Sequence, residues 1–438
     1  KRLMLNLMKS KKLYLIFFCL IIFLFASLFL RDESKDHYNF EEVSNADSIF
    51  WLSQGGRNNR YITCSVYYNF DKPLDQALIL ERIKDLINSY KMFNRNIIEI
   101  NKLPYWQKTK PDWNKNFYKL RPEESIEQYR ALADFELSQP STEGEGAPLF
   151  RVYLTHDQKQ LVFIWHHVIS DFEGMLNKHA LHLFETTEER TKFGYQLKDF
   201  QIPKSEQENN FAFNKFFYRS VGSQKSDFNV NEITLPVKDI DLYEIGLNND
   251  LSMSDVFSFI TARAIGNYYE SLSELEKPTL PIISPLSLRK NSLALDEGNN
   301  RAIKKFPIVF PMEPIAKTYE RFSLVLTSSG SYDQAGQAMK FLRRTSIFEM
   351  PIRRISAADF ISNYFPLADM ELEIGDSSLI DHNFRVPLMP FERTKFAWSN
   401  YDGKVVLFLH TDPILIQSDV MTASANKAIE EVLSFLRN

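Results

Sequence analysis

The longest apolar run in the chain is "LYLIFFCLIIFLFASLFL", residues 13–30, which contains no charged residue. As a helix it would extend roughly 27 Å, which matches the hydrocarbon thickness of a bilayer. A cleaved signal peptide and a buried core helix are the alternatives. A core helix would carry polar interruptions, however, and "FASLFL" is a poor cleavage site. The run therefore predicts an uncleaved, single-pass transmembrane signal anchor.

The flanks of this run predict its orientation. Five basic residues lie within the flank 1–12, and the charged stretch 31–47 reads as a linker. By the positive-inside rule, the basic flank places the rest of the chain outside the cytoplasm, with the cytoplasmic face as the alternative.

Beyond residue 47, the spacing of apolar positions predicts a mixed α/β chain in two halves. "RYITCSVYYNF" (60–70) and the pair of runs within 148–165 are typical of strands. Apolar positions at helical spacing follow Asp75 and, later, Gly174. The polar stretch 201–210 is the expected crossing between halves, so we expect an N-terminal lobe at 48–210 and a C-terminal lobe at 211–438.

The second half repeats this mixture of elements. "SMSD" (252–255) has the spacing of a capping box and predicts the start of a helix. Residues 280–289 predict a buried strand that runs into a loop. The segment 395–410 predicts a hairpin turned at Asp402–Gly403, and a helix is expected at the C-terminus.

Composition and charge exclude some classes of function. The 438 residues are 44% hydrophobic and include 36 Phe, enough for a large core. With 52 basic and 56 acidic residues the net charge is −4, which argues against a nucleic-acid partner. The two cysteines, Cys19 and Cys64, cannot form a disulfide framework.

The candidate chemistry lies in "LVFIWHHVISDFEG" (161–174), because four of the eight histidines fall within 17 residues that begin here. His179 and His182, spaced i and i+3, could bind zinc together with a ligand from the double-His loop, although no HExxH or CxxC supports this. Alternatively, the loop histidines could be structural and bonded to backbone. A third interpretation makes one of them a general base, since a neutral imidazole accepts a proton near neutral pH.

Alternation along a strand favours the third interpretation. Neighbouring strand residues point to opposite faces, so His166 and His167 can serve different purposes. One can support the core while the other faces a cavity.

The stretch "HHVISD", followed by a helix, resembles the HHxxxDG motif of the chloramphenicol-acetyltransferase-like acyltransferases, which include condensation domains and polyketide-associated acyltransferases. The similarity extends over about residues 48–438, in the family's order. It is carried by "FDKPLDQALILERIKDLINSYKMF", "APLFRVYLTHDQKQLVFIWHHVISD", "LSMSDVFSFITARAIGNYY", "SPLSLRKNSLALDEGNN" and "YDGKVVLFLHTDPILI".

The resemblance implies a fold and a role for each motif residue. Two similar α/β lobes would form a V with a channel through their interface, so that donor and acceptor enter from opposite faces. His167 matches the general base and His166 the structural histidine. Asp171 matches the motif aspartate, which pairs with an arginine, here Arg289.

The chain departs from this pattern at one motif position. Phe172 stands where the motif has a small residue, and we expect its ring to narrow one channel mouth. Gly174 could supply the missing flexibility. Ser287 and Asn299 are further candidates for polar groups near the channel, and the plant-type DFGWG motif is absent.

We therefore expect a membrane-anchored, monomeric acyltransferase of lipid metabolism that needs no bound cofactor or metal. Its co-substrate would be acyl-CoA or another activated acyl donor. The acceptor would be a hydroxyl of a lipid, glycolipid or envelope component, with an amine as the alternative acceptor group. The alternative is a non-catalytic, condensation-domain-like binding module at the membrane, for which Phe172 is the best support.

Overall fold

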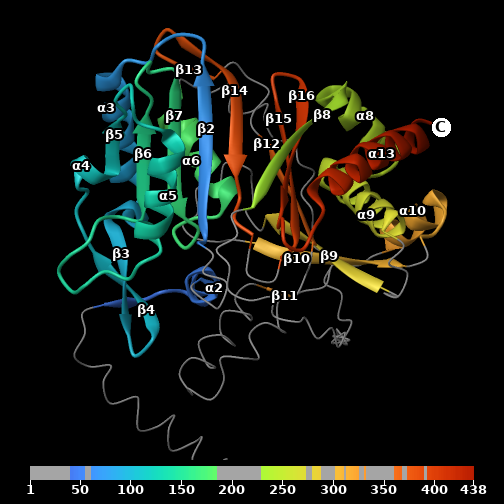
Figure 1. Cartoon of the computed structure of the whole chain (residues 1–438), viewed down its shortest axis with the longest axis horizontal. Coiled ribbons are helices and arrows are strands. Elements are labelled where there is room, and N and C mark those ends of the chain that lie inside the picture. Colours follow the sequence, from blue (N-terminus) through green and yellow to red (C-terminus); the bar gives the residue numbers. More distant parts are fainter. Residues whose placement is uncertain are drawn as a thin grey trace, which may run out of the picture.

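Two large β-sheets stand side by side in the computed structural model and give the molecule two lobes (Figure 1). The structure describes residues 40–54, 61–184, 228–272, 279–287, 301–309, 312–324, 330–331, 360–366, 372–388 and 392–438. The expected mixed α/β architecture is confirmed within these residues.

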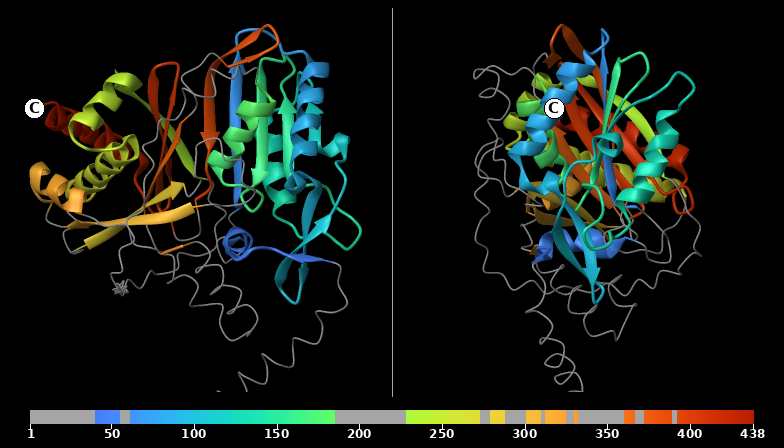
Figure 2. Two further views of the ribbon diagram at one scale, coloured as in Figure 1. Left: turned by 180° about the vertical axis from the view of Figure 1, so that it is seen from behind. Right: turned by 90° about the vertical axis from the view of Figure 1, so that its left-hand side faces the viewer.

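The sheet of the first lobe has six strands in the order β13-β14-β2-β7-β6-β5. In chain order these are β2 (Thr63–Phe70), β5 (Phe117–Lys119), β6 (Phe150–Leu154), β7 (Gln160–His166), β13 (Glu373–Ile374) and β14 (Ser377–Arg385). Helix α5 (Ile126–Leu137) lies on one face, and α3 (Gln76–Ser89) and α6 (Phe172–His182) lie on the other (Figure 2). β7 is central and almost entirely buried, so its end is held rigidly.

A smaller unit joins the first lobe at its lower end. Its three strands, in the order β1-β4-β3, are β1 (Glu41–Glu42), β3 (Arg95–Ile100) and β4 (Leu103–Lys108). The helix α2 (Asn45–Ser53) follows β1, and the short α4 (Trp113–Asn116) and the 3₁₀ turn η2 (Lys91–Asn94) connect the remaining elements. Strand β1 and the start of α2 therefore fall within the stretch 31–47 that was expected to be a linker.

The second lobe packs a layer of helices against a sheet of seven strands, ordered β11-β10-β9-β12-β15-β16-β8. The strands are β8 (Asn229–Lys238), β9 (Thr279–Ser287), β10 (Arg301–Val309), β11 (Gly330–Ser331), β12 (Phe360–Pro366), β15 (Thr394–Tyr401) and β16 (Lys404–Thr411). The helices are α8 (Asp239–Asn248), α9 (Met253–Ser271), α10 (Ile315–Leu324) and α13 (Ser418–Arg437).

Two locally encoded features of this lobe, a helix cap and a hairpin turn, are confirmed. Ser252 and Asp255 make both hydrogen bonds of a capping box at the start of α9. β15 and β16 form the antiparallel hairpin, and both Asp402 and Gly403 have positive φ in its turn. These features depend on residues close together in sequence, which is why the sequence could predict them.

The C-terminal half also contributes to the first lobe. β14 pairs antiparallel with β2, with Phe384 opposite Val66, and β13 pairs with β14. The predicted lobe boundary at residue 210 therefore does not assign every strand to its own sheet. Two strands from the later part of the chain, β13 and β14, complete the first sheet.

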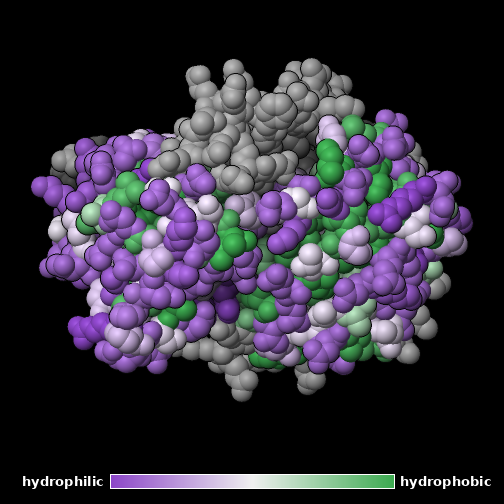
Figure 3. Space-filling model, turned by 90° about the horizontal axis from the view of Figure 1, so that it is seen from above, coloured by the Kyte–Doolittle hydropathy of each residue, from purple (hydrophilic) through white to green (hydrophobic). Residues whose placement is uncertain are grey.

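The view from above (Figure 3) shows hydrophobic side chains on both halves of this face, with more of them on the half that belongs to the second lobe. The outer side of α8 contributes to the exposed apolar surface, since Ile240 is 56% exposed and Tyr243 and Leu247 are also exposed.

The expected membrane anchor at residues 13–30 lies outside the described residues. Among the helices of the described part, none is both long enough and apolar enough to cross a bilayer.

Candidate active site

The double histidine lies where β7 ends at the lower part of the first sheet. His166 is the last residue of β7, and its backbone N–H donates to Leu149 O at 3.0 Å. The N–H of His167 donates to Ile62 O, just before β2, at 2.9 Å. The segments that precede β6 and β2, one on each side of β7, thus fix the backbone of the two histidines.

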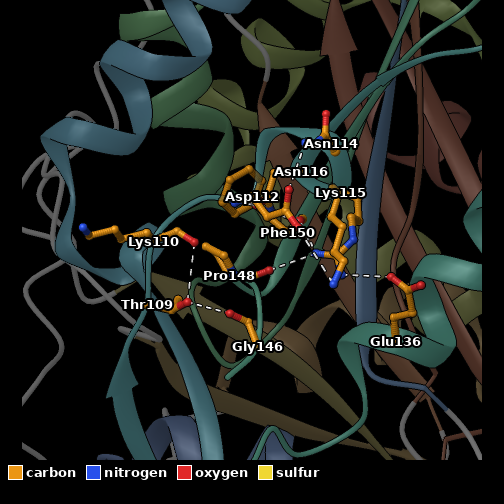
Figure 4. A network of polar contacts seen from close by, with 11 residues as sticks. Thr109, Lys110, Asp112, Asn114, Lys115, Asn116, Glu136, Gly146, Pro148 and Phe150 are labelled. Atoms are coloured by element: carbon orange, nitrogen blue, oxygen red, sulfur yellow. Dashed lines mark hydrogen bonds and ion pairs between the residues drawn. The ribbon is translucent and has the colours of Figure 1, made fainter. Parts of the chain in front are cut away.

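The start of β6, beside this point, is held by a polar network that Figure 4 shows from close by. Asn116 Nδ2 donates to Phe150 O at 2.8 Å, and Arg151 donates to Pro148 O at 3.0 Å and to Glu136 at 2.9 Å. Because Phe150 pairs with Trp165, the network anchors the strand that fixes the end of β7.

His166 is a buried structural residue. Its Nδ1 accepts the N–H of Val168 at 3.1 Å, so the proton lies on Nε2, which donates to Gln54 Oε1 at 2.8 Å. The side chain is fully buried. Burial, aided by the neighbouring His167, lowers the pKa of His166 to about 3, and the ring is neutral at physiological pH.

His167 is the more accessible of the pair. It is half-buried, in the turn that follows β7, although its Nδ1 atom is buried. The ring of Phe50 lies parallel to the imidazole, with centroids 3.8 Å apart and an angle of 4° between planes. The imidazole is therefore covered on one side by an aromatic ring while the residue keeps contact with solvent.

Helix α2 supplies the contacts to both histidines. Phe50 stacks on His167, Trp51 lies 5.1 Å from the ring of His166, and Gln54, which follows the helix, binds His166. Sequence reasoning missed these residues, because no local pattern connects α2 to a loop more than 100 residues later. The sequence signal at this place was the apolar triplet "IFW" (49–51), which is followed by the polar Ser53 and Gln54.

Asp171 caps a helix. It is the N-cap residue of α6, where its Oδ1 accepts the N–H of Gly174 at 2.7 Å, and it is buried. The helix begins at Phe172, earlier than the expected start after Gly174, so Gly174 belongs to the first turn. The expected partner Arg289 lies outside the described residues, and the pairing stays a prediction.

Phe172 lies in the core at the junction of the two lobes. Its ring is 1% exposed and contacts Trp165 of β7, Phe365 of β12 and Phe384 of β14, with centroid separations of 5.1, 4.8 and 4.9 Å. The large side chain therefore links the two sheets through aromatic packing. Of the two further channel candidates, Ser287 ends β9, opposite Arg301 of β10, and Asn299 lies outside the described residues.

The two helical histidines have polar protein partners. His179 Nδ1 lies 2.9 Å from the Tyr68 hydroxyl, and His182 contacts Asp85 Oδ2 through Nδ1 and the Tyr90 hydroxyl through Nε2. Among the described residues, no group of three or more His, Cys, Asp or Glu side chains is arranged to hold a metal ion. These contacts favour structural roles over the zinc interpretation.

Comparison with known proteins finds a similarity of fold to solved structures. No protein-family model matches the chain, and no curated protein matches its sequence. Among solved structures, it is similar to a variant of the starter condensation domain of rhizomide synthetase RzmA in complex with C8-CoA and Leu-SNAC. That match has 12% identity and a TM-score of 0.57, and covers 91% of this chain and 95% of that one.

A second similar structure is the first condensation domain of the calcium-dependent antibiotic synthetase, in complex with a substrate analogue. It has 13% identity and a TM-score of 0.56, and the match covers 91% of this chain and 97% of that one. The expected two-lobed α/β architecture is confirmed: the chain has the fold of condensation domains.

Proposed function

We propose that this protein is an acyltransferase in which His167 is the general base. The observation that carries the proposal is the contrast between the two histidines. His166 is fully buried with two hydrogen bonds, whereas the half-buried His167 keeps contact with solvent at the end of a rigid strand. A base needs a fixed position and access to its substrate, and His167 combines both.

In the proposed reaction, the neutral imidazole of His167 takes the proton of an acceptor hydroxyl or amine as the acceptor atom attacks the donor's acyl carbonyl. The tetrahedral intermediate then collapses and breaks the bond to the leaving group. The imidazolium returns the proton to the leaving thiolate or alkoxide, and the base is regenerated. General base catalysis of this kind is worth about 10²–10⁴-fold in rate.

The substrates are proposed as an acyl thioester or acyl lipid as donor and a hydroxyl of a lipid, glycolipid or envelope component as acceptor. The solved relatives support a thioester donor, since one was crystallised with C8-CoA. The lipid acceptor and an extracytoplasmic site rest on the apolar run 13–30 and its basic flank. An amine acceptor is the alternative.

The test compares the full-length parent with His167→Ala in detergent, using C8-CoA as donor and a matched pair of acceptors, 1-octanol and octylamine. We expect the parent to form the ester in preference to the amide, as measured by mass spectrometry. His167→Ala should lower the rate by about 10²–10⁴-fold. His156→Ala is the matched control, because His156 is exposed in a turn far along the strand pair from the site.

Each outcome has a distinct meaning. A His167→Ala variant that matches the parent rate contradicts the general-base assignment, and a preference for amide contradicts the hydroxyl acceptor. A folded parent that consumes neither pair of substrates favours the non-catalytic binding module. Because C8-CoA does not cross bilayers, transfer by sealed right-side-out vesicles supports the extracytoplasmic site, and transfer only after permeabilisation contradicts it.

A further inference from the structure

The contact between Phe50 and His167 is closer and more nearly parallel than ordinary core packing requires. The two ring centroids are 3.8 Å apart with an interplanar angle of 4°, and Phe50 is 4% exposed. Neutral aromatic pairs more often adopt offset or edge-to-face arrangements. A face-to-face stack is well suited to a ring that carries positive charge, because the π face of an aromatic ring attracts a cation.

The helix that carries Phe50 is tied to neighbouring elements before and after that residue. Just before the helix, the N–H of Val43 donates to Pro104 O of β4 at 3.3 Å, and after Phe50 the Trp51 indole N–H donates to Glu99 of β3 at 2.8 Å. Gln54, just past its end, accepts from His166 at 2.8 Å. Phe50 is thus presented to the imidazole by a helix fixed on both sides of the contact.

We propose that Phe50 is a positioning residue for the base: its ring fixes the plane of the His167 imidazole and stabilises the imidazolium that forms as the acceptor loses its proton. This inference rests on the proposed function of His167. It assigns to α2, an element outside the double-His motif, a part in the proton transfer. The residue that approaches the substrate remains His167.

The principal test replaces Phe50 with Leu, which keeps an apolar side chain but removes the π face, and with Tyr, which keeps the ring. With C8-CoA and 1-octanol, Phe50→Leu should lower kcat about 3- to 30-fold while the KM for C8-CoA changes less than about twofold. Phe50→Tyr should retain most of the parent kcat. Phe435→Leu, on α13 of the second lobe, is the matched control and should leave both constants unchanged.

A second measurement does not depend on activity. In the full-length protein with isotope-labelled histidine, the stacked ring of Phe50 should shift the ring-proton resonances of His167 upfield. These resonances are identified by their loss in His167→Gln. Phe50→Leu should move them downfield, whereas Phe50→Tyr should not.

The outcomes separate this inference from the proposed function. If His167→Ala abolishes transfer but Phe50→Leu keeps the parent kcat, or if the His167 resonances show no upfield shift, the role of Phe50 is wrong and the base stands. If His167→Ala is as active as the parent, the base assignment fails, and with it the proposed part of Phe50 in the proton transfer. A loss of kcat in Phe50→Tyr equal to that in Phe50→Leu also overturns the inference, provided that both melt near the parent temperature.

Discussion

At the scale of single residues, burial decides what a histidine can do in this protein. His166, His179, His382 and His410 are all buried within the described core. Burial lowers the pKa of His382 to about 4 and that of each of the other three to about 3, from an ordinary value of 6.5. Their environments disfavour the charged form, so these four serve the fold rather than acid–base chemistry at neutral pH.

These four histidines predict acid sensitivity. Their folded pKa values lie below the unfolded value, so the unfolded chain binds more protons between about pH 6.5 and pH 3. Stability is therefore fully present above pH 6.5 and is lost as the pH falls through this window. Each group contributes up to about 1.4 kcal/mol per pH unit, and we expect a steep decline in the free energy of unfolding measured by denaturant titration between pH 7 and pH 5.

A single substitution tests the origin of this decline. His382 Nε2 lies 3.0 Å from Ser399 Oγ, which donates to Phe365 O, so a glutamine at position 382 can keep a donor toward Ser399. His382→Gln should reduce the slope of stability against pH by about 1.4 kcal/mol per pH unit. His156→Gln, on the surface, should not, and equal slopes in all three proteins would contradict the assignment.

At the scale of secondary structure, the double-His motif is the junction of a buried strand and a capped helix. β7 fixes the histidines, and Asp171 begins α6 by binding the N–H of Gly174. The cap satisfies one of the backbone donors that a helix N-terminus leaves unpaired. Asp171 thus has a structural role in this chain, the capping of α6, that does not require Arg289.

Two variants of Asp171 separate capping from charge pairing. Asp171→Ala removes both, whereas Asp171→Asn keeps a cap and removes the charge. If capping dominates, Ala should cost about 1 kcal/mol of unfolding free energy and Asn should restore most of it. If Asn stays as unstable as Ala and both lose about 3–5 kcal/mol, a buried ion pair such as that expected with Arg289 is the larger contribution.

At the scale of the whole molecule, the two lobes are joined by backbone exchange and by aromatic packing. β14 enters the first sheet from the later part of the chain, and its Phe384 contacts Phe172 of the first lobe and Phe408 of the second. Phe365 completes the contact from β12. The core at the junction is therefore shared between the lobes, and Phe172 is one of its central side chains.

Removing the Phe172 side chain should destabilise the protein. Phe172→Ala leaves a cavity beside three aromatic rings, and we expect a loss of about 3–5 kcal/mol in the free energy of unfolding. Phe135→Ala makes the same change on α5 at a side chain that is 51% exposed, and should cost far less. If Phe172→Ala instead keeps the parent stability and lowers the KM for C8-CoA, the ring acts mainly as an obstruction of the channel, as its place in the motif suggested.

Local sequence was sufficient for the features that neighbouring residues determine. The strand at 60–70, the strand pair within 148–165, the capping box at Ser252 and the hairpin turn at Asp402–Gly403 all follow from periodicity and turn chemistry within a few residues. The two-lobed fold followed from the motif resemblance, since "HHVISD" and its flanks are read from one continuous stretch.

Tertiary structure alone decided the rest, because it depends on residues far apart in the chain. Only the folded chain brings Phe50 onto His167, Gln54 onto His166, and β14 beside β2. Phe172 was the clearest case: in the sequence it is a bulky residue in place of a small one, and in the structure it is a core residue between lobes. The sequence by itself determined which residues carry the candidate chemistry, and the packing of distant segments determined which of them is only half-buried, which is fully buried and what holds each in place.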